Sequence, residues 1–163
     1  MQQINLRECL VSDIETLKIW DQDPVIKSAF GGDSGYEWEA ELPNEKPWQE
    51  YLIAELGQKP IGFIQIIDPL LEETHYWGQV DPNLRAIDIW IGEPFFRGKG
   101  YGSKIMQLIF DRCFQIENRD AILVDPLKSN LRAINFYQNH GFEIIRERVF
   151  DSEVCLEMRK AKP

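Results

Sequence analysis

The feature that most constrains the fold is an alternating apolar segment, residues 86–91, followed closely by three glycines: Gly98, Gly100 and Gly102. The alternation predicts a strand in which isoleucines cover one face while Asp88 and Trp90 share the other. Apolar residues then recur at helical spacing from about Ser103, so a helix should follow the glycines and pack on a sheet. This order brings backbone N–H groups to the positive end of a helix dipole, which favours binding of a phosphate or pyrophosphate.

The glycine spacing separates this turn from two common nucleotide-binding motifs. It lacks the G-x-G-x-x-G pattern of dinucleotide-binding folds, and no G-K-[ST] sequence follows, as a Walker loop would require. Arg97 and Lys99 flank the first glycine and would add positive charge beside a bound anion. A plain strand-to-helix connection, in which glycine only relieves backbone strain, is the alternative.

Length and hydropathy predict one domain outside the membrane. The 163 residues fit a single domain over 1–163 with one core. No apolar run approaches the roughly 18 residues of a membrane-spanning helix. The first residues lack the charged and apolar regions of a signal peptide. We therefore expect a cytoplasmic protein with no membrane partner.

The net charge and the spacing of the cysteines and histidines limit the kinds of partner that the protein can bind. A net charge of −9 argues against nucleic acid and permits a cationic substrate, because an acidic cleft concentrates cations. Solubility alone is the alternative explanation of this charge. The three cysteines are far apart and the two histidines lack ligand spacing, so neither a disulfide, a metal site nor a Cys–His nucleophile is predicted.

The remaining segments predict further strands and helices around this centre. Strands are expected at 4–10, 51–56, 61–67 and 121–124, from Phe142, and at 154–158, and helices from Ser12 and over 131–139. The strands at 51–56 and 61–67 flank a Gly-Gln-Lys-Pro turn and should form an antiparallel hairpin. Ser12 and Glu15 have capping-box spacing at the start of the first helix. Residues 159–163 should form a frayed tail.

Two segments rich in acidic and aromatic residues are candidates for substrate walls. In residues 21–48, aromatic rings are scattered among carboxylates, a composition that suits an amphipathic cation. A lid over a ligand and a pair of short helices with a solvated acidic face are equally good interpretations of this segment. The second segment, residues 70–83, carries Glu72, Glu73 and Trp77 and ends in a turn before the central strand.

Two motifs resemble those of the GCN5-related N-acetyltransferases (GNAT). Residues 97–102 match the pyrophosphate-cradling sequence Q/R-x-x-G-x-G/A of this family. Asn130, Ala133 and Tyr137, followed by Gly-Phe at 141–142, match its N-x-x-A-x-x-x-Y-x-x-x-G-F element. The order of predicted elements also resembles the GNAT order over essentially the whole chain. The resemblance implies a mixed α/β (α+β) fold, with a central, mostly antiparallel sheet, a parallel central pair splayed to hold acetyl-CoA, and flanking helices.

The same resemblance implies acetyl-CoA as a co-substrate and no metal. The residues expected to bind acetyl-CoA are Trp90, Ile91, Arg97, Gly98, Lys99, Gly100, Tyr101, Gly102, Asn130, Ala133 and Tyr137. A backbone N–H near Trp90 or Ile91 is expected to stabilise the oxyanion of the reaction. Asn130 is expected to contact the pantetheine arm or the nearby backbone.

Within the superfamily, three stretches resemble the aminoglycoside 6′-N-acetyltransferases: residues 81–88, 125–134 and 30–32. The resemblance implies acetyl transfer to the 6′-amine of an aminoglycoside or a similar small cationic amine, by a monomer or a homodimer. One alternative keeps the chemistry and changes the acceptor to a peptide, a lysine side chain or an intermediate of siderophore synthesis. Another is an acyl-CoA sensor without catalysis.

Acetyl transfer from a thioester to an amine needs a neutral amine and a proton for the leaving thiolate. Asp88 is the first candidate for binding the ammonium group and accepting its proton, and Asp125 is the second. Asp88 could instead pair with Arg85 or Arg132, and Asp125 could be a turn residue. Tyr137 resembles the tyrosine that protonates the coenzyme A sulfur, with packing against the sheet as its alternative. The expected substrate-binding residues are Glu72, Glu73, Trp77, Asp88 and Asp125.

Overall fold

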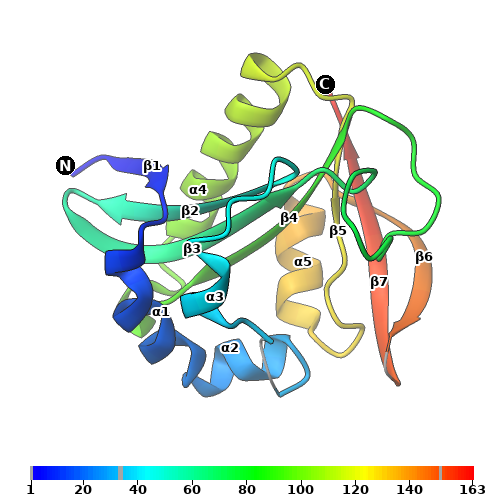
Figure 1. The fold of residues 1–163 in the computed structure, drawn as a ribbon. Coiled ribbons are helices and arrows are strands. Elements are labelled where there is room, and N and C mark those ends of the chain that lie inside the picture. Colours follow the sequence, from blue (N-terminus) through cyan, green and yellow to red (C-terminus); the bar gives the residue numbers. More distant parts are fainter. Residues whose placement is uncertain (1, 33–34, 151) are drawn as a thin grey trace.

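A seven-stranded sheet in the order β1-β2-β3-β4-β5-β7-β6 runs through the computed structural model, which describes residues 2–32, 35–150 and 152–163 (Figure 1). The strands are β1 (Ile4–Glu8), β2 (Gln49–Leu56), β3 (Lys59–Ile67), β4 (Leu84–Ile91), β5 (Ala121–Val124), β6 (Glu143–Phe150) and β7 (Glu153–Ala161). Neighbouring strands are antiparallel except β4 and β5, which run parallel. This topology confirms the predicted mixed fold with one parallel pair inside a mostly antiparallel sheet.

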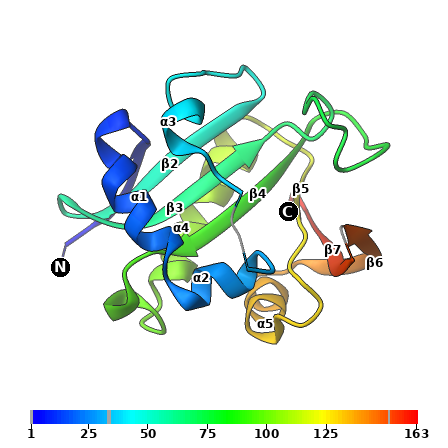
Figure 2. The ribbon, with the colours of Figure 1, turned by 60° about the horizontal axis from the view of Figure 1, so that its bottom comes forward.

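Helices cover both faces of the sheet (Figure 2). They are α1 (Ile14–Asp21), α2 (Pro24–Ala29), α3 (Trp38–Glu41), α4 (Tyr101–Phe110), which continues as a π-helix over Asp111–Ile116, and α5 (Leu131–Asn139). Helices α4 and α5 contribute Ile105 and Ile134 to one core cluster, whereas α1 and α3 contribute Leu17 and Trp38 to a second. Within the described ranges, none of the helices has the length and apolar character needed to cross a membrane.

Strand β4 lies between these two cores, as its alternation predicts. Ile87 is buried in the cluster that contains α4, and Ile89 packs against that cluster. Trp90 instead packs against the cluster under α1, α2 and α3. Asp88 lies two residues before Trp90, so both side chains are on the same face of the strand. The Asp88 carboxylate therefore lies on the face covered by the N-terminal helices.

The parallel pair separates along its length. Strand β4 pairs with β3 over six positions, from Ala86 to Ile91, but its register with β5 covers only Leu84, Arg85 and Ala86. From Ile87 onward, the backbone groups of β4 that face β5 therefore do not pair with that strand. This confirms the predicted splay, and it produces an opening in the middle of the sheet.

Two local predictions are wrong, and a third is confirmed with different bounds. The turn before α1 is closed by Asp13, whose carboxylate accepts the Leu10 amide at 2.8 Å, in place of the predicted box between Ser12 and Glu15. The β2–β3 hairpin is confirmed, with each strand starting two residues earlier than predicted. Residues 159–163 are not a frayed tail, because Ala161 pairs with Ala121 of β5 and the Lys162 amide donates to the Asp120 carbonyl at 2.8 Å.

Candidate active site

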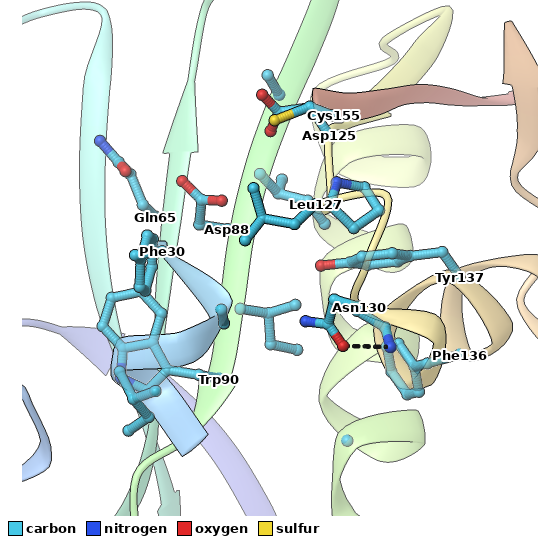
Figure 3. A pocket seen from close by; sticks show the side chains of 18 of the residues that line it. Phe30, Gln65, Asp88, Trp90, Asp125, Leu127, Asn130, Phe136, Tyr137 and Cys155 are labelled. Carbon is cyan, nitrogen blue, oxygen red and sulfur yellow. Dashed lines mark hydrogen bonds between the residues drawn. The ribbon is translucent and has the colours of Figure 1, made fainter. Parts of the chain in front are cut away.

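A cavity of about 1410 Å³ opens where β4 and β5 diverge (Figure 3). One part, which we call the glycine-loop arm, is bordered by Gly98, Gly100, Gly102, Ser103, Asn130, Ala133, Phe136 and Tyr137. The other part, the carboxylate arm, is bordered by Phe30, Tyr36, Gln65, Tyr76, Asp88 and Asp125. The two arms meet beside β4. A cavity of this shape can hold two reactants with their reacting groups together.

The glycine-loop arm ends at the N-terminus of α4. Gly100 is the N-cap of this helix and has φ of 83°, a left-handed conformation that favours glycine. The first N–H groups of an α-helix have no acceptor within the helix and lie at its positive end. A Cβ atom at Gly102 would lie 3.3 Å from the ring of Phe136, so glycine allows α4 and α5 to approach closely. This arm can therefore accept an anion at a glycine-lined helix terminus.

Arg97 also borders the cavity, and its side chain is held by hydrogen bonds within the protein. Its Nε donates to the Ile91 carbonyl at 2.9 Å, its Nη2 to the Gly92 carbonyl at 3.1 Å, and its Nη1 to Asp23 at 3.1 Å. The guanidinium thus holds the end of β4 against the start of α2. The Lys99 ammonium lies 3.3 Å from the centre of the exposed Phe95 ring. The predicted contact between Arg97 and the phosphates of acetyl-CoA stays a prediction.

The carboxylates of Asp88 and Asp125 both point into the cavity, from β4 and from the end of β5 (Figure 3). Arg85 was one of the two arginines that could have formed an ion pair with Asp88. It pairs instead with Asp68 at 3.1 Å and with Glu117 at 3.0 Å. Burial raises the pKa of Asp88 to about 6. Burial, and then the nearby charge of Asp88, raise the pKa of Asp125 to about 7. These carboxylates can bind a cation and can exchange a proton close to neutral pH.

Tyr137 and Asn130 project from α5 toward the same space (Figure 3). Tyr137 packs on Phe142, with ring centres 5.4 Å apart, and its side-chain oxygen points into the cavity. Burial, with the charges of Asp88 and Asp125, raises the pKa of this phenol, which therefore keeps its proton at neutral pH. Asn130 caps α5, because its Oδ1 accepts the Ala133 amide at 3.2 Å. Its amide nitrogen is directed into the cavity (Figure 3).

Residues 21–48 contain the predicted pair of short helices, α2 and α3, while a role as a lid stays a prediction; Asp33 and Ser34 lie outside the described residues. The aromatic residues pack together: Tyr36 stacks on Trp38 with centres 4.4 Å apart, and Phe30 meets Trp90 edge-on at 5.3 Å. Trp38 is buried, whereas Phe30 and Tyr36 also border the cavity. The segment thus supplies both core and cavity wall.

The 70–83 segment borders the cavity through Glu72, Thr74, Tyr76 and Trp77. Glu72 is 7% exposed, and its carboxylate accepts the Thr74 amide at 2.8 Å and hydroxyl at 2.9 Å, and the Tyr76 amide at 3.0 Å. Glu73 is exposed and does not border the cavity. Trp77 borders the cavity but is 3% exposed and packs in a core cluster with residues of β4 and β5. Glu72 thus shapes the loop and Trp77 fills the core, while their contact with a substrate stays a prediction.

Tyr76 is the residue of this segment that the sequence did not single out. Its hydroxyl donates a hydrogen bond to Asp125. The density of aromatic residues in the segment was a signal, but it did not identify which ring would reach the site. No group of three or more His, Cys, Asp or Glu residues in the described parts of the chain is placed to hold a metal ion.

Comparisons with known proteins point to one family. Residues 10–150 match the family model described as an acetyltransferase (GNAT) domain. The aminoglycoside N(6′)-acetyltransferase type 1 of Klebsiella pneumoniae is 36% identical over 92 residues, which are 56% of this chain and 46% of that protein. The chain therefore spans about half the length of that relative.

Two further matches cover different shares of the chain. A kanamycin resistance protein of Rhizobium radiobacter is 37% identical over 75 residues, which are 45% of this chain and 69% of that protein. The solved structure of the aminoglycoside acetyltransferase AAC(6′)-Ib in complex with ribostamycin and coenzyme A has a TM-score of 0.87 and 27% sequence identity, and it covers 98% of this chain and 94% of the other.

Proposed function

Since this chain belongs to the GNAT family of acetyltransferases, we propose that it transfers the acetyl group of acetyl-CoA to a primary amine of a cationic small molecule, most specifically the 6′-amine of an aminoglycoside. The observation that carries the proposal is the placement of Asp88, Asp125 and Tyr137 around the junction of the two arms. Two carboxylates and a protonated phenol at one point are the groups that amine acetylation needs.

Acetyl-CoA occupies the glycine-loop arm in this proposal. Backbone N–H groups from Gly98 to Gly102 bind its pyrophosphate, since they lie at the start of α4. The open edge of β4 beyond Ala86 offers backbone groups to the pantetheine arm. One N–H near Trp90 or Ile91 donates to the carbonyl oxygen as negative charge develops there. Asn130 and Ala133 border the same arm and contact the co-substrate.

The acceptor amine enters the carboxylate arm as an ammonium ion, because an alkylamine is mostly protonated at neutral pH. Asp125 binds the ammonium group, and Asp88 accepts its proton directly or through a water molecule. The neutral amine then attacks the thioester carbonyl carbon. When the carbon–sulfur bond breaks, Tyr137 donates its proton to the leaving sulfur of coenzyme A. The attacking nitrogen, now positively charged, releases its second proton, which returns through water to the Tyr137 oxygen and leaves a neutral amide.

Two findings support an aminoglycoside as the acceptor. The related proteins named above include an aminoglycoside N(6′)-acetyltransferase, a kanamycin resistance protein, and an acetyltransferase solved with ribostamycin. The carboxylate arm also combines acidic groups with the rings of Phe30 and Tyr36, which suits a molecule with several ammonium groups and apolar ring faces. The cytoplasmic location, the single domain over 1–163 and the monomeric or homodimeric state stay predictions.

The proposal is tested by acetyl-CoA turnover, followed through the released thiol. Kanamycin, ribostamycin, spermidine, a lysine derivative and a short peptide are compared at equal concentration. We expect kcat/KM to be highest for the aminoglycosides, and NMR of the product should place the acetyl group on the 6′-amine. Turnover of the peptide alone would reject the aminoglycoside. Tight coenzyme A binding without turnover of any amine would favour the sensor.

A further inference from the structure

Tyr76 and Asp125 are joined by a hydrogen bond across 49 positions of the chain. Tyr76 lies in the connection between β3 and β4, Asp125 follows β5, and both border the carboxylate arm. We propose that Tyr76 is a positioning residue, which holds one oxygen of the Asp125 carboxylate and leaves the other oxygen for the ammonium group of the acceptor. The ammonium part of this inference rests on the proposed function.

The Tyr76 ring is fixed on several sides. It stacks on Phe150 of β6 with centres 4.1 Å apart and planes 13° apart, and it meets Trp77 edge-on at 5.6 Å. The Arg148 guanidinium carbon lies 5.7 Å from the ring centre, and its Nη2 donates to the Tyr76 carbonyl. Such packing leaves the ring little freedom to turn, so the direction of the hydroxyl is set before any ligand binds.

The backbone of the loop is fixed by Glu72. Its buried carboxylate accepts the amides of Thr74 and Tyr76, as well as the Thr74 hydroxyl. Although burial opposes it, these hydrogen bonds hold the pKa of Glu72 below its ordinary value, so this carboxylate stays ionised. Glu72 thus acts on the site through the position of Tyr76.

The surroundings of Asp125 explain why this support matters. Six titratable groups interact electrostatically with Asp125. They are Asp88 of β4, Tyr76 of the β3–β4 loop, Tyr137 of α5, Arg148 of β6, and Cys155 and Glu157 of β7. Burial and the charge of Asp88 raise the pKa of Asp125, whereas the Tyr76 hydroxyl and Arg148 oppose that rise. A hydrogen bond donated to a carboxylate favours its charged form. Tyr76 therefore favours the anionic form of Asp125, the form that binds an ammonium group.

The first test measures the carboxyl group itself and needs no substrate. Carbon-13 NMR of aspartate-labelled protein gives the pKa of Asp125, with the resonance assigned from its loss in Asp125→Asn. Tyr76→Phe retains the ring stack and removes only the hydroxyl. We expect the pKa of Asp125 to rise by about one unit, because a hydrogen bond to a charged group is lost.

A matched control for this measurement is Tyr51→Phe, which removes a phenol-to-carboxylate hydrogen bond from Tyr51 of β2 to Glu41 of α3, a pair that borders the same cavity but does not act on Asp125. We expect this control to leave the pKa of Asp125 unchanged. An unchanged pKa of Asp125 in Tyr76→Phe would overturn the proposal. This result is independent of which amine the enzyme acetylates.

The second test is a double-mutant cycle with kanamycin as the acceptor. In the wild-type background, Tyr76→Phe should raise KM about tenfold at neutral pH, change kcat less, and move the acid limb of kcat/KM to higher pH. In the Asp125→Asn background, the same substitution should change KM less than about twofold, because its target charge is gone. Equal effects in both backgrounds would contradict the proposal. Failure of the wild-type enzyme to turn over any amine would count against the proposed function and leave the NMR result standing.

Discussion

Asp88 lies directly opposite Gln65 in the antiparallel ladder of β4 and β3. The Gln65 side chain is itself fixed, since its Oε1 accepts the Tyr36 hydroxyl at 2.6 Å and its Nε2 donates to Gln49 at 3.2 Å. These cross-strand neighbours are neutral and already hydrogen-bonded to one another. None of these three side chains carries a positive charge that would balance the carboxylate of Asp88.

Replacement of this carboxylate should therefore separate catalysis from folding. We expect Asp88→Asn to lower kcat by about 100-fold or more, because a positioned general base is lost. The melting temperature should not fall, since the substitution removes a buried charge close to that of Asp125. Glu73→Gln is the control, because Glu73 is exposed and outside the cavity. A raised KM in this control would restore Glu73 to the substrate site.

Activity and stability should respond to pH in opposite directions. The pKa values of about 6 for Asp88 and about 7 for Asp125 predict that kcat/KM falls as the pH drops below about 7, because both groups take up protons. Their folded-state pKa values lie above the unfolded value of about 4, so the folded protein binds more protons between about pH 4 and pH 7. The contribution of these two groups to stability is therefore largest at low pH and declines as the pH rises through that range.

Thermal unfolding of Asp125→Asn and of the wild type is compared across this pH range. The difference between the two proteins separates the contribution of Asp125 to stability from those of the other carboxylates. We expect the variant to be the more stable protein at pH 8, with the difference shrinking toward pH 5. A difference that does not vary with pH would show that the Asp125 carboxyl titrates at its ordinary pKa in the folded protein.

Tyr137→Phe tests the proton donor. We expect kcat to fall by about 100-fold, while the Kd of coenzyme A changes by less than about threefold, since only the phenolic oxygen is removed. The ring contact with Phe142 remains available to phenylalanine, so the melting temperature should change little. Unchanged turnover would assign Tyr137 to packing alone.

Gly100→Val tests the glycine-loop arm. A β-branched residue is strained at a φ of 83° and would crowd the start of α4, so we expect coenzyme A binding to weaken at least about tenfold. Gly57→Val is the matched control, because Gly57 has φ of 65° in the β2–β3 hairpin turn and does not border the cavity. Both variants should lose stability, but coenzyme A affinity should fall only in Gly100→Val. Equal affinity losses would attribute the effect to global strain.

Features that depend on local chain geometry could be predicted from the sequence. The period of two along β4 fixes the faces of Asp88 and Ile87 wherever the strand lies. The left-handed turn at Gly100 and the cap at Asn130 depend on a few consecutive residues. For this reason, the strand, the loop and the start of α5 were correctly placed before their partners were known.

Features that depend on distant partners could not be predicted in the same way. Arg97 has the charge expected at a phosphate site, but its direction is decided by Asp23, 74 positions away. Glu72 has the charge expected at an ammonium site, yet the turn after it supplies its hydrogen-bond donors. The length of β7 depends on pairing with β5, which no period within residues 153–161 reveals. In each case the sequence identified the type of side chain, but the direction of the side chain is determined by the tertiary fold.

The short register between β4 and β5 has a consequence for the dynamics of the main chain. Beyond Ala86, every second amide of β4 faces the opening in the sheet rather than a neighbouring strand. Those amide protons should exchange with solvent faster than their neighbours that bond to β3. A co-substrate that accepts hydrogen bonds there should slow their exchange and raise the unfolding temperature together. The divergence of two strands thus makes the rigidity of the sheet depend on occupancy of the site.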